Sequence, residues 1–234
     1  MSMSRVVKQA WKAALLAIVC INALMGADTY NWNLPRGFSV PRVPADNPMT
    51  EAKVELGRYL FYDTRMSVNG KSSCATCHRQ DLAFTDGRAV GVGTTGELHS
   101  RSAMSLVNVA YAAALTWSNP KLTELEEQAL VPMFGEHPIE LGLREGDAFQ
   151  AILRSDAKYR VLFERAFPGE TELFTIKNVT KALACFERSI ISGRSPYDRY
   201  HYVGDDSALS ADRGLSDIDA RPGGFDRVSA VADR

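Results

Sequence analysis

Two cysteines and a histidine stand close together in the segment Cys74-Ala75-Thr76-Cys77-His78. This C-x-x-C-H spacing lets two thiols form thioether bonds to the vinyl groups of a haem, and it places the imidazole to ligate the iron from one face. A zinc site would need a second pair of ligands, and the sequence has no second C-x-x-C. The motif therefore predicts covalently bound haem c on Cys74 and Cys77, with His78 as the iron ligand.

Helical patterns on both sides of the motif would position it. Thr50 can cap a helix over residues 51–61, and Thr175 can cap a later amphipathic helix in which Cys185 is expected to be a small buried thiol. Residues 123–126 read as a capping box that opens a helix ending near Pro132. Further helical patterns cover residues 102–115 in part, residues 145–154 and residues 156–167. With few strand alternations, the predicted fold class is mainly α.

The amino-acid composition limits the classes of protein to which the chain can belong. The chain has 234 residues, of which 45% are hydrophobic and 24% are charged, which is typical of one globular domain with a real core. Lys and Arg number 27 and Asp and Glu number 28, so the net charge is −1. A strongly basic nucleic-acid binder is therefore excluded, and no nucleic-acid partner is expected.

The N-terminus reads as a secretory signal over residues 1–27. Apolar residues 13–25 follow a basic start, and Gly26 and Ala27 offer a small-residue cleavage region. The apolar stretch is shorter than the roughly 20 residues of a spanning helix. We expect export to the periplasm, cleavage, and no stable membrane span afterwards. An uncleaved anchor and a lipid attached at Cys20 are the alternatives.

Three further segments complete the predicted organisation. Residues 28–49 contain four prolines and read as an extended lead-in. Residues 50–208 carry the helical patterns and the cysteine motif, and they form the predicted haem domain. Residues 209–234 are rich in Arg, Asp, Ala and Gly without amphipathic periodicity, which predicts an irregular, disordered C-terminal tail.

The sequence around the motif resembles that of the di-haem cytochrome c peroxidase and MauG family. Residues 56–88 read LGRYLFYDTRMSVNGKSSCATCHRQDLAFTDGR, and the resemblance continues through RSAMSLVN, LEEQ, PIELG and FERSIISGRSPYDRY. It covers roughly residues 50–200. Three stretches are most similar to the MbnH-like subgroup associated with methanobactin gene clusters, namely YNWNLPRGF, ELHSRSAMSL and FGEHPIELGL.

The resemblance implies a fold and an activity. The fold would be a cytochrome c-like haem domain, equivalent to the N-terminal half of a di-haem peroxidase. The activity would be that of an oxidoreductase that uses hydrogen peroxide, through a high-valent haem, to oxidise a side chain of a periplasmic partner protein, a tryptophan in that subgroup. The alternatives are a peroxide-detoxifying peroxidase served by an electron donor, a mono-haem electron carrier with Met104 or Met133 as sixth ligand, and an inactive truncated fragment.

The resemblance also implies roles for individual residues. Gln128, Pro132 and Glu140 match distal-pocket positions, and Trp117 matches a tryptophan that relays electrons between two haems. A carboxylate in a poorly solvated pocket can take a proton from the near oxygen of peroxide and return it to the far one, and Glu140 is the candidate. Glu136 is its rival. The alternatives without a catalytic role are that Pro132 only ends a helix, that Gln128 is a solvated helix residue, and that Trp117 is a core residue.

The sixth iron position is expected to be open. The family's distal histidine would fall near residues 93–94, where this chain has Gly and Thr, and His99 is displaced from that place. Ser102 stands where the family often has a calcium-binding asparagine, so calcium is possible but unsupported. His137 lies in the distal segment, either bonded there or on the surface. The acids of residues 122–128 are expected on a solvated helix face.

The family has two C-x-x-C-H motifs, and this chain has one. The resemblance stops at residues 212–215, where the Arg- and Asp-rich tail has begun. We expect one haem in this chain, a second in a full-length family member, and a frameshift or truncated gene model near residue 215. The chain alone is then expected to have weak or no activity toward a partner protein.

Overall fold

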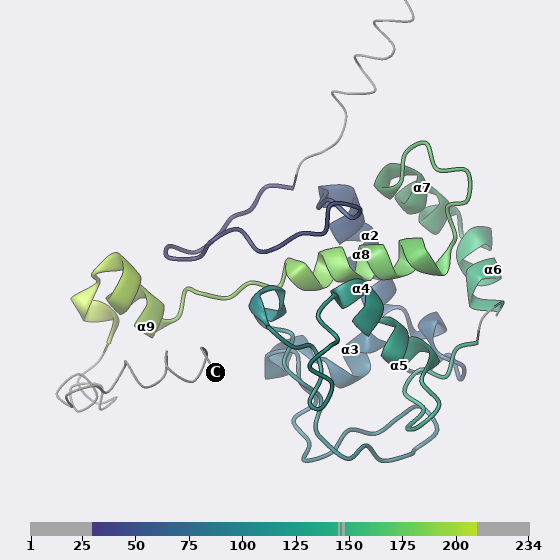
Figure 1. The fold of residues 1–234 in the computed structure, drawn as a ribbon, viewed down its shortest axis with the longest axis horizontal. Coiled ribbons are helices and arrows are strands. Elements are labelled where there is room, and N and C mark those ends of the chain that lie inside the picture. The colour runs from purple at the N-terminus through teal and green to yellow at the C-terminus, as the bar shows by residue number, and fades with distance from the viewer. Residues whose placement is uncertain (1–29, 145, 147, 210–234) are drawn as a thin grey trace, which may run out of the picture. The chain divides into compact units, whose positions relative to one another are not determined.

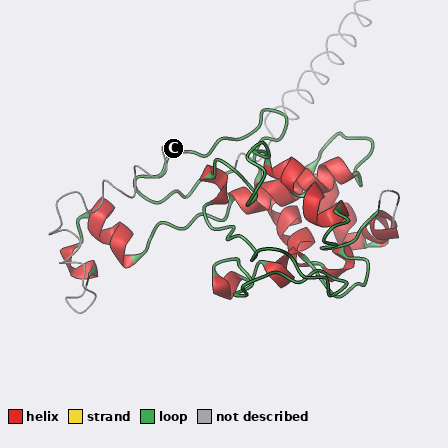
Figure 2. Cartoon of the chain, turned by 60° about the horizontal axis from the view of Figure 1, so that its bottom comes forward, coloured by secondary structure: helices red, strands yellow, loops and turns green. Residues whose placement is uncertain are grey.

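The computed structural model describes residues 30–144, 146 and 148–209. The predicted signal over residues 1–27 and all but the first residue of the predicted tail lie outside the described residues. Within the described part, helices alternate with loops, two isolated β-bridges occur, and no strand forms, as Figure 2 shows. The mainly α prediction is therefore confirmed. None of the described helices is both long and apolar enough to cross a membrane.

Two helices form the centre of the larger unit (Figure 1). α2 spans Glu51–Tyr62 and α8 spans Ile176–Arg188. The predicted caps are confirmed, because the Thr50 and Thr175 side chains accept from backbone amides three residues on. The helices approach so closely at Gly57 that a Cβ there would lie 1.9 Å from the backbone oxygen of Ala182. Only glycine permits this contact.

The apolar faces of these helices close a continuous core with two shorter helices. α6 spans Ala148–Ser155 and α7 spans Ala157–Ala166, close to their predicted ranges. The most deeply buried side chains of this core are Leu56, Leu60, Phe61, Met66, Leu153, Phe163, Val179 and Leu183. Each such side chain contributes about 1.5–3 kcal/mol relative to an exposed one.

The segment before the distal residues differs from its prediction. It forms two short helices, α4 over Leu125–Gln128 and α5 over Leu130–Phe134, and no side chain caps α4. The predicted capping box is wrong because the Glu126 carboxylate bonds Arg188 and Asn47 instead of reaching back to residue 123. Pro132 does not end a helix. It is the third residue of α5, within the first turn, where its missing N–H is not required.

The loops around the cysteine motif contain only single turns. These are η1 (Thr64–Met66), α3 (Cys74–Cys77), η2 (Gln80–Leu82) and η3 (Val109–Tyr111). The helix partly predicted over residues 102–115 is reduced to η3, because Asn108 adopts a positive φ of 60° at its start. The Ser105 hydroxyl donates to the backbone oxygen of Ala83 at 2.6 Å and fixes the preceding residues as a loop.

The contact pattern divides the described chain into two units. The larger contains residues 30–32 and 41–190, and the smaller contains residues 33–40 and 191–209. Within the smaller unit lie α9 (Pro196–Asp198), η4 (Arg199–Val203) and η5 (Asp206–Ala208). Its two segments meet where the ring of Phe38 covers Gly193. The residues of the cysteine motif and the predicted distal residues all belong to the larger unit.

Candidate haem-binding site

The motif itself forms one helical turn. The amide of His78 donates to the backbone oxygen of Cys74 at 2.9 Å, and the amide of Ser73 donates to the Thr76 hydroxyl at 2.9 Å. The three described cysteines are free thiols. Burial raises the pKa of both motif thiols, Cys74 and Cys77. Cys74 packs against the core, whereas Cys77 faces a cavity.

The imidazole of His78 has a fixed orientation. Its Nδ1 atom lies 2.9 Å from the backbone oxygen of Phe84. A carbonyl oxygen only accepts, so Nδ1 carries the hydrogen and Nε2 is left as the metal-binding nitrogen. Burial lowers the pKa of His78, and the hydrogen bond to the backbone oxygen of Phe84 opposes that lowering. A neutral imidazole is the form that ligates a metal.

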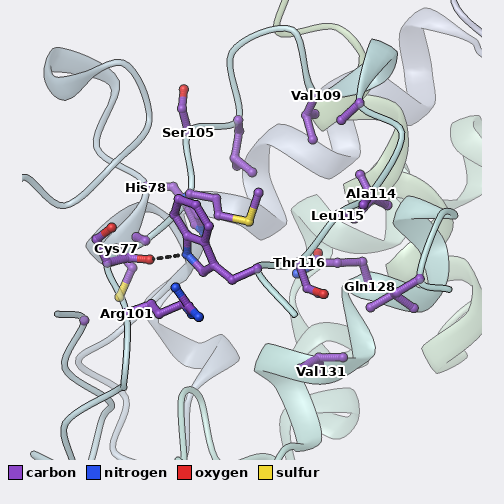
Figure 3. Close-up of a pocket in the computed structure, with 18 of the residues that line it drawn as sticks. Cys77, His78, Arg101, Ser105, Val109, Ala114, Leu115, Thr116, Gln128 and Val131 are labelled. Carbon is purple, nitrogen blue, oxygen red and sulfur yellow. Dashed lines mark hydrogen bonds between the residues drawn. The ribbon is translucent and has the colours of Figure 1, made fainter. Parts of the chain in front are cut away.

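A cavity of about 470 Å³ opens beside this histidine (Figure 3). The structure brings five of the predicted site residues to its wall: Cys77, His78, Trp117, Gln128 and Glu140. Apolar side chains supply much of the remainder, among them Met104, Leu106, Val109, Leu115 and Val131. The volume is that of a small-molecule site. A thiol and an imidazole on one side, with apolar walls, fit a covalently attached haem.

Two predicted residues do not line the cavity. Cys74 packs against the core, one turn before Cys77, and Pro132 lies in α5 beside the lining residue Val131. The backbone oxygen of Pro132 accepts from the amide of Leu141 at 2.9 Å. Pro132 therefore holds the backbone next to Glu140 and has no side-chain contact with the cavity.

Glu140 faces the cavity and its rival does not. Its backbone oxygen accepts from the amide of Thr94 at 2.9 Å, which fixes this segment against the loop of residues 91–101. Burial raises the pKa of the Glu140 carboxyl, and positive charge on His99 opposes that rise. Glu136 and His137 are both exposed, and neither lines the cavity.

Trp117 lies at the open side of the cavity, not in the core. Its side chain is 53% exposed, and its Nε1 donates to the backbone oxygen of Ser102 at 2.8 Å. The Arg101 guanidinium stands 6.0 Å from the ring centroid. The alternative of a buried core tryptophan is therefore wrong.

A buried ion pair positions the helix that carries Gln128. Both guanidinium nitrogens of Arg188 donate to the two oxygens of Glu126, at 2.8 and 2.7 Å. Their side chains are only 3% and 17% exposed, so the expected solvated face is wrong for Glu126. Burial raises the pKa of Glu126, but hydrogen bonds from Arg188 and Asn47 outweigh it and the pKa is lowered.

Neither Arg188 nor Asn47 was predicted from the sequence to have a role. Asn47 is fully buried, donates to Glu126 at 2.6 Å and accepts from the Lys53 ammonium at 3.1 Å. The available signals were Asn47 just before the helix cap and Arg188 at the end of the amphipathic helix. In the described residues, no group of three or more His, Cys, Asp or Glu could hold a metal ion. The backbone oxygen of Ser102, the residue at the family's calcium position, accepts from the Trp117 indole N–H.

Comparisons with known proteins agree with this geometry. The family model for di-haem cytochrome c peroxidase matches residues 51–207. The methylamine utilization protein MauG of Methylophilus methylotrophus is 35% identical over 208 residues, which cover 85% of this chain and 60% of that protein. A cytochrome c peroxidase of Denitromonas iodatirespirans is 35% identical over 203 residues, covering 86% of this chain and 52% of that protein.

A solved structure is similar as well. It is a MauG-like protein associated with microbial copper homeostasis, 43% identical, with a TM-score of 0.75, and the match covers 80% of this chain and 54% of that one. The chain thus spans between about half and 60% of the length of these relatives.

Proposed function

Because the chain belongs to the di-haem cytochrome c peroxidase family, we propose that it binds one haem c covalently and uses hydrogen peroxide to oxidise a side chain of a periplasmic partner protein. One observation carries the proposal. The oriented imidazole of His78 and the half-buried Glu140 line the same cavity. The resemblance to the MbnH-like subgroup favours a tryptophan as the target side chain.

The three residues of the C-x-x-C-H motif would each make one bond to the haem. Cys74 and Cys77 would fasten it through thioether bonds, and Nε2 of His78 would ligate its iron. Bound haem supplies a redox-active iron that receives peroxide and stores oxidising equivalents. The apolar walls, including Leu106 and Leu115, exclude water from this side of the cavity.

Glu140 and Gln128 handle the peroxide. The Glu140 carboxylate would take the proton from one peroxide oxygen and return it to the other, which would leave as water. This needs a group whose pKa is above that of an ordinary carboxyl, and burial of Glu140 acts in that direction. Glu126 of α4 pairs with Arg188 of α8, which holds the helix that carries Gln128. The Gln128 amide orients the peroxide by hydrogen bonding.

Trp117 is placed to pass electrons inward, from a partner protein at the surface to the haem. Its indole reaches from the cavity to the surface, and its N–H is bonded to a carbonyl oxygen, which cannot accept a proton. An indole that loses an electron here therefore keeps its proton. Arg101, 6.0 Å from the ring, makes that loss harder and sets how strong an oxidant is needed.

The electron-carrier alternative lacks a suitable methionine. Met133 is 1% exposed in the core, and it does not line the cavity. Met104 lines the cavity, but no contact within the described residues orients its side chain as an iron ligand. No strong sixth ligand opposite His78 is therefore assigned within the described residues.

The experiment is a rapid-mixing measurement on the haem-loaded chain. Wild type should react with stoichiometric peroxide, and Glu140→Gln should react more slowly by about two to four orders of magnitude. Glu136→Gln is the matched control, because that carboxyl is exposed and near in sequence. Equal rates in wild type and Glu140→Gln would refute the role of Glu140.

A peroxide-detoxifying peroxidase is the second candidate. It is favoured by the similarity to the Denitromonas cytochrome c peroxidase, whose 35% identity equals that of the MauG relative. The two functions differ in the electron source. Peroxide-dependent oxidation of a reduced small cytochrome, without a mass change in any tryptophan-containing protein, would favour the detoxifying enzyme.

A further inference from the structure

A second titratable side chain shares the cavity with Glu140. The proposed function uses Glu140 alone for proton transfer, yet His99 also lines the wall. The titratable and charged residues of this wall are Cys77, His78, His99, Arg101 and Glu140. Of these, Cys77 and His78 are assigned to haem attachment and Arg101 stands over Trp117. His99 is left without a role.

The backbone directs His99 into the cavity. Its amide donates to the backbone oxygen of Gly91 at 3.0 Å, and an antiparallel bridge joins Val92 to Leu98. Side chains alternate between the two faces of such a paired segment. Leu98 is accordingly 65% exposed, and the next residue, His99, faces the opposite way.

The same hairpin is fastened to the segment that carries Glu140. The amide of Thr94 donates to the backbone oxygen of Glu140 at 2.9 Å, and the Glu97 carboxylate accepts from the amide of Ile139 at 3.1 Å. The contact is so close that a Cβ on Gly93 would lie 1.9 Å from the backbone oxygen of Ile139. His99 and Glu140 are therefore held on two directly bonded segments.

Burial and the charge of His99 act on the Glu140 carboxyl in opposite directions. Burial disfavours the ionised form of Glu140, and positive charge on His99 favours it. An imidazole can be neutral or positive near neutral pH, so it can supply this charge when needed.

We propose that His99 is a positioning residue for the peroxide reaction, which keeps Glu140 ionised by receiving its proton. Loss of a proton by the Glu140 carboxyl and gain of one by the His99 imidazole together leave the net charge of the cavity unchanged. The Glu140 carboxylate is then free to take the proton of peroxide. The inference rests on the proposed function, and it extends the proton-handling site by one residue.

The test reads the protonation of Glu140 directly, without peroxide. In the ferric, haem-loaded chain, the infrared C=O band of the protonated carboxyl is assigned by its loss in Glu140→Gln and followed against pH. In His99→Gln the midpoint of this band should move up by about one pH unit, a tenfold change in the proton equilibrium. In His99→Lys, which keeps a positive charge, it should not move up. His137→Gln, an exposed histidine nearby, is the matched control and should leave the midpoint unchanged.

An unchanged midpoint in His99→Gln overturns the inference, as does an equal upward shift in His99→Lys. If His99→Gln does not fold, His99→Lys still decides, since an upward shift there contradicts a charge effect. Failure of the proposed function is a separate result. It would appear as a Glu140→Gln variant that reacts with peroxide at the wild-type rate, whatever the midpoint does.

Discussion

The imidazole of His78 is bonded through Nδ1 to the backbone oxygen of Phe84, at 2.9 Å, six residues further along the chain. That oxygen is presented by a tight turn, in which the amide of Phe84 bonds the oxygen of Arg79 and both Ala83 and Phe84 have positive φ values. The residues after the motif therefore orient the His78 imidazole, the proposed iron ligand. Non-glycine residues in this conformation cost about 1–2 kcal/mol each, which the packed turn must offset.

The two thiols of the motif should attach haem independently. Cys74→Ala and Cys77→Ala should each retain haem through one thioether bond, and the double variant should lose covalent haem. Mass spectrometry of the denatured chain, with a pyridine haemochrome spectrum, measures this. Cys185→Ala removes a thiol outside the cavity and should leave attachment complete. Loss of covalent haem in that variant would contradict the assignment.

The peroxide reaction should weaken in acid. The pKa of Glu140 is raised by burial, so its carboxylate is lost at a higher pH than an ordinary carboxylate as pH falls. The rate constant with peroxide should fall as pH drops through that raised pKa. Rapid mixing between neutral and acidic pH measures the profile. The acid limb should vanish in Glu140→Gln, and its persistence there would assign the limb to another group.

Replacing Trp117 should slow the oxidation of a partner protein and leave the rate of the reaction with peroxide unchanged. Trp117→Phe removes the Nε1 bond to Ser102 and the easily oxidised indole. Oxidation of a partner protein should slow by about tenfold or more, equivalent to roughly 1.4 kcal/mol on the barrier. The first reaction with peroxide should keep its rate. Comparing the two rates in one preparation gives the measurement, and an equal loss in both would point to a structural role.

The Glu126–Arg188 pair should stabilise the fold. Glu126→Gln leaves a guanidinium buried without its charge partner, which costs about 3–5 kcal/mol. Denaturant unfolding measures the loss. Glu124→Gln is the control, because its partner Arg42 is exposed and such pairs contribute about 0–1 kcal/mol. Similar losses in both variants would contradict the importance of burial.

The sign of the pH effect at Glu126 follows from its lowered pKa. Its contribution to stability is present above the unfolded-state pKa and is lost as pH falls through the lower folded-state value. Wild type should therefore lose more stability on acidification than Glu126→Gln does.

Glu187 should act in the opposite direction. Its carboxyl is buried with Oε2 unpartnered, and burial raises its pKa from 4.5 to about 8. Between those values the folded state binds the extra proton, so stability falls by about 1.4 kcal/mol per pH unit as pH rises. Glu187→Gln should remove this slope and be more stable than wild type at pH 8. Unfolding at a series of pH values decides, and parallel curves for the two proteins would refute it.

Local signals predicted much of the fold. The caps at Thr50 and Thr175 and the apolar face of α8 are encoded within a few residues, so the helices they define were predictable. The capping box before α4 failed because a residue 62 positions away, Arg188, competes for the Glu126 carboxylate. Long-range ion pairs of this kind leave no periodic pattern.

The candidate site shows the same division. Spacing alone predicts the roles of Cys74, Cys77 and His78, since haem attachment depends on adjacent residues. His99 could not be assigned, because its approach to Glu140 depends on a hairpin whose bonds join Thr94 to a segment more than forty residues away. The choice between Glu140 and Glu136 likewise needed the structure, because both acids lie in one short loop and only one faces the cavity.

The proposed function requires that haem bound by His78 can still take up peroxide. The most direct measurement is the electron paramagnetic resonance spectrum of the ferric, haem-loaded chain at neutral pH. We expect a high-spin signal that is lost on addition of one equivalent of peroxide. A purely low-spin signal, of the kind given by two strong axial ligands, that does not change with peroxide would contradict it.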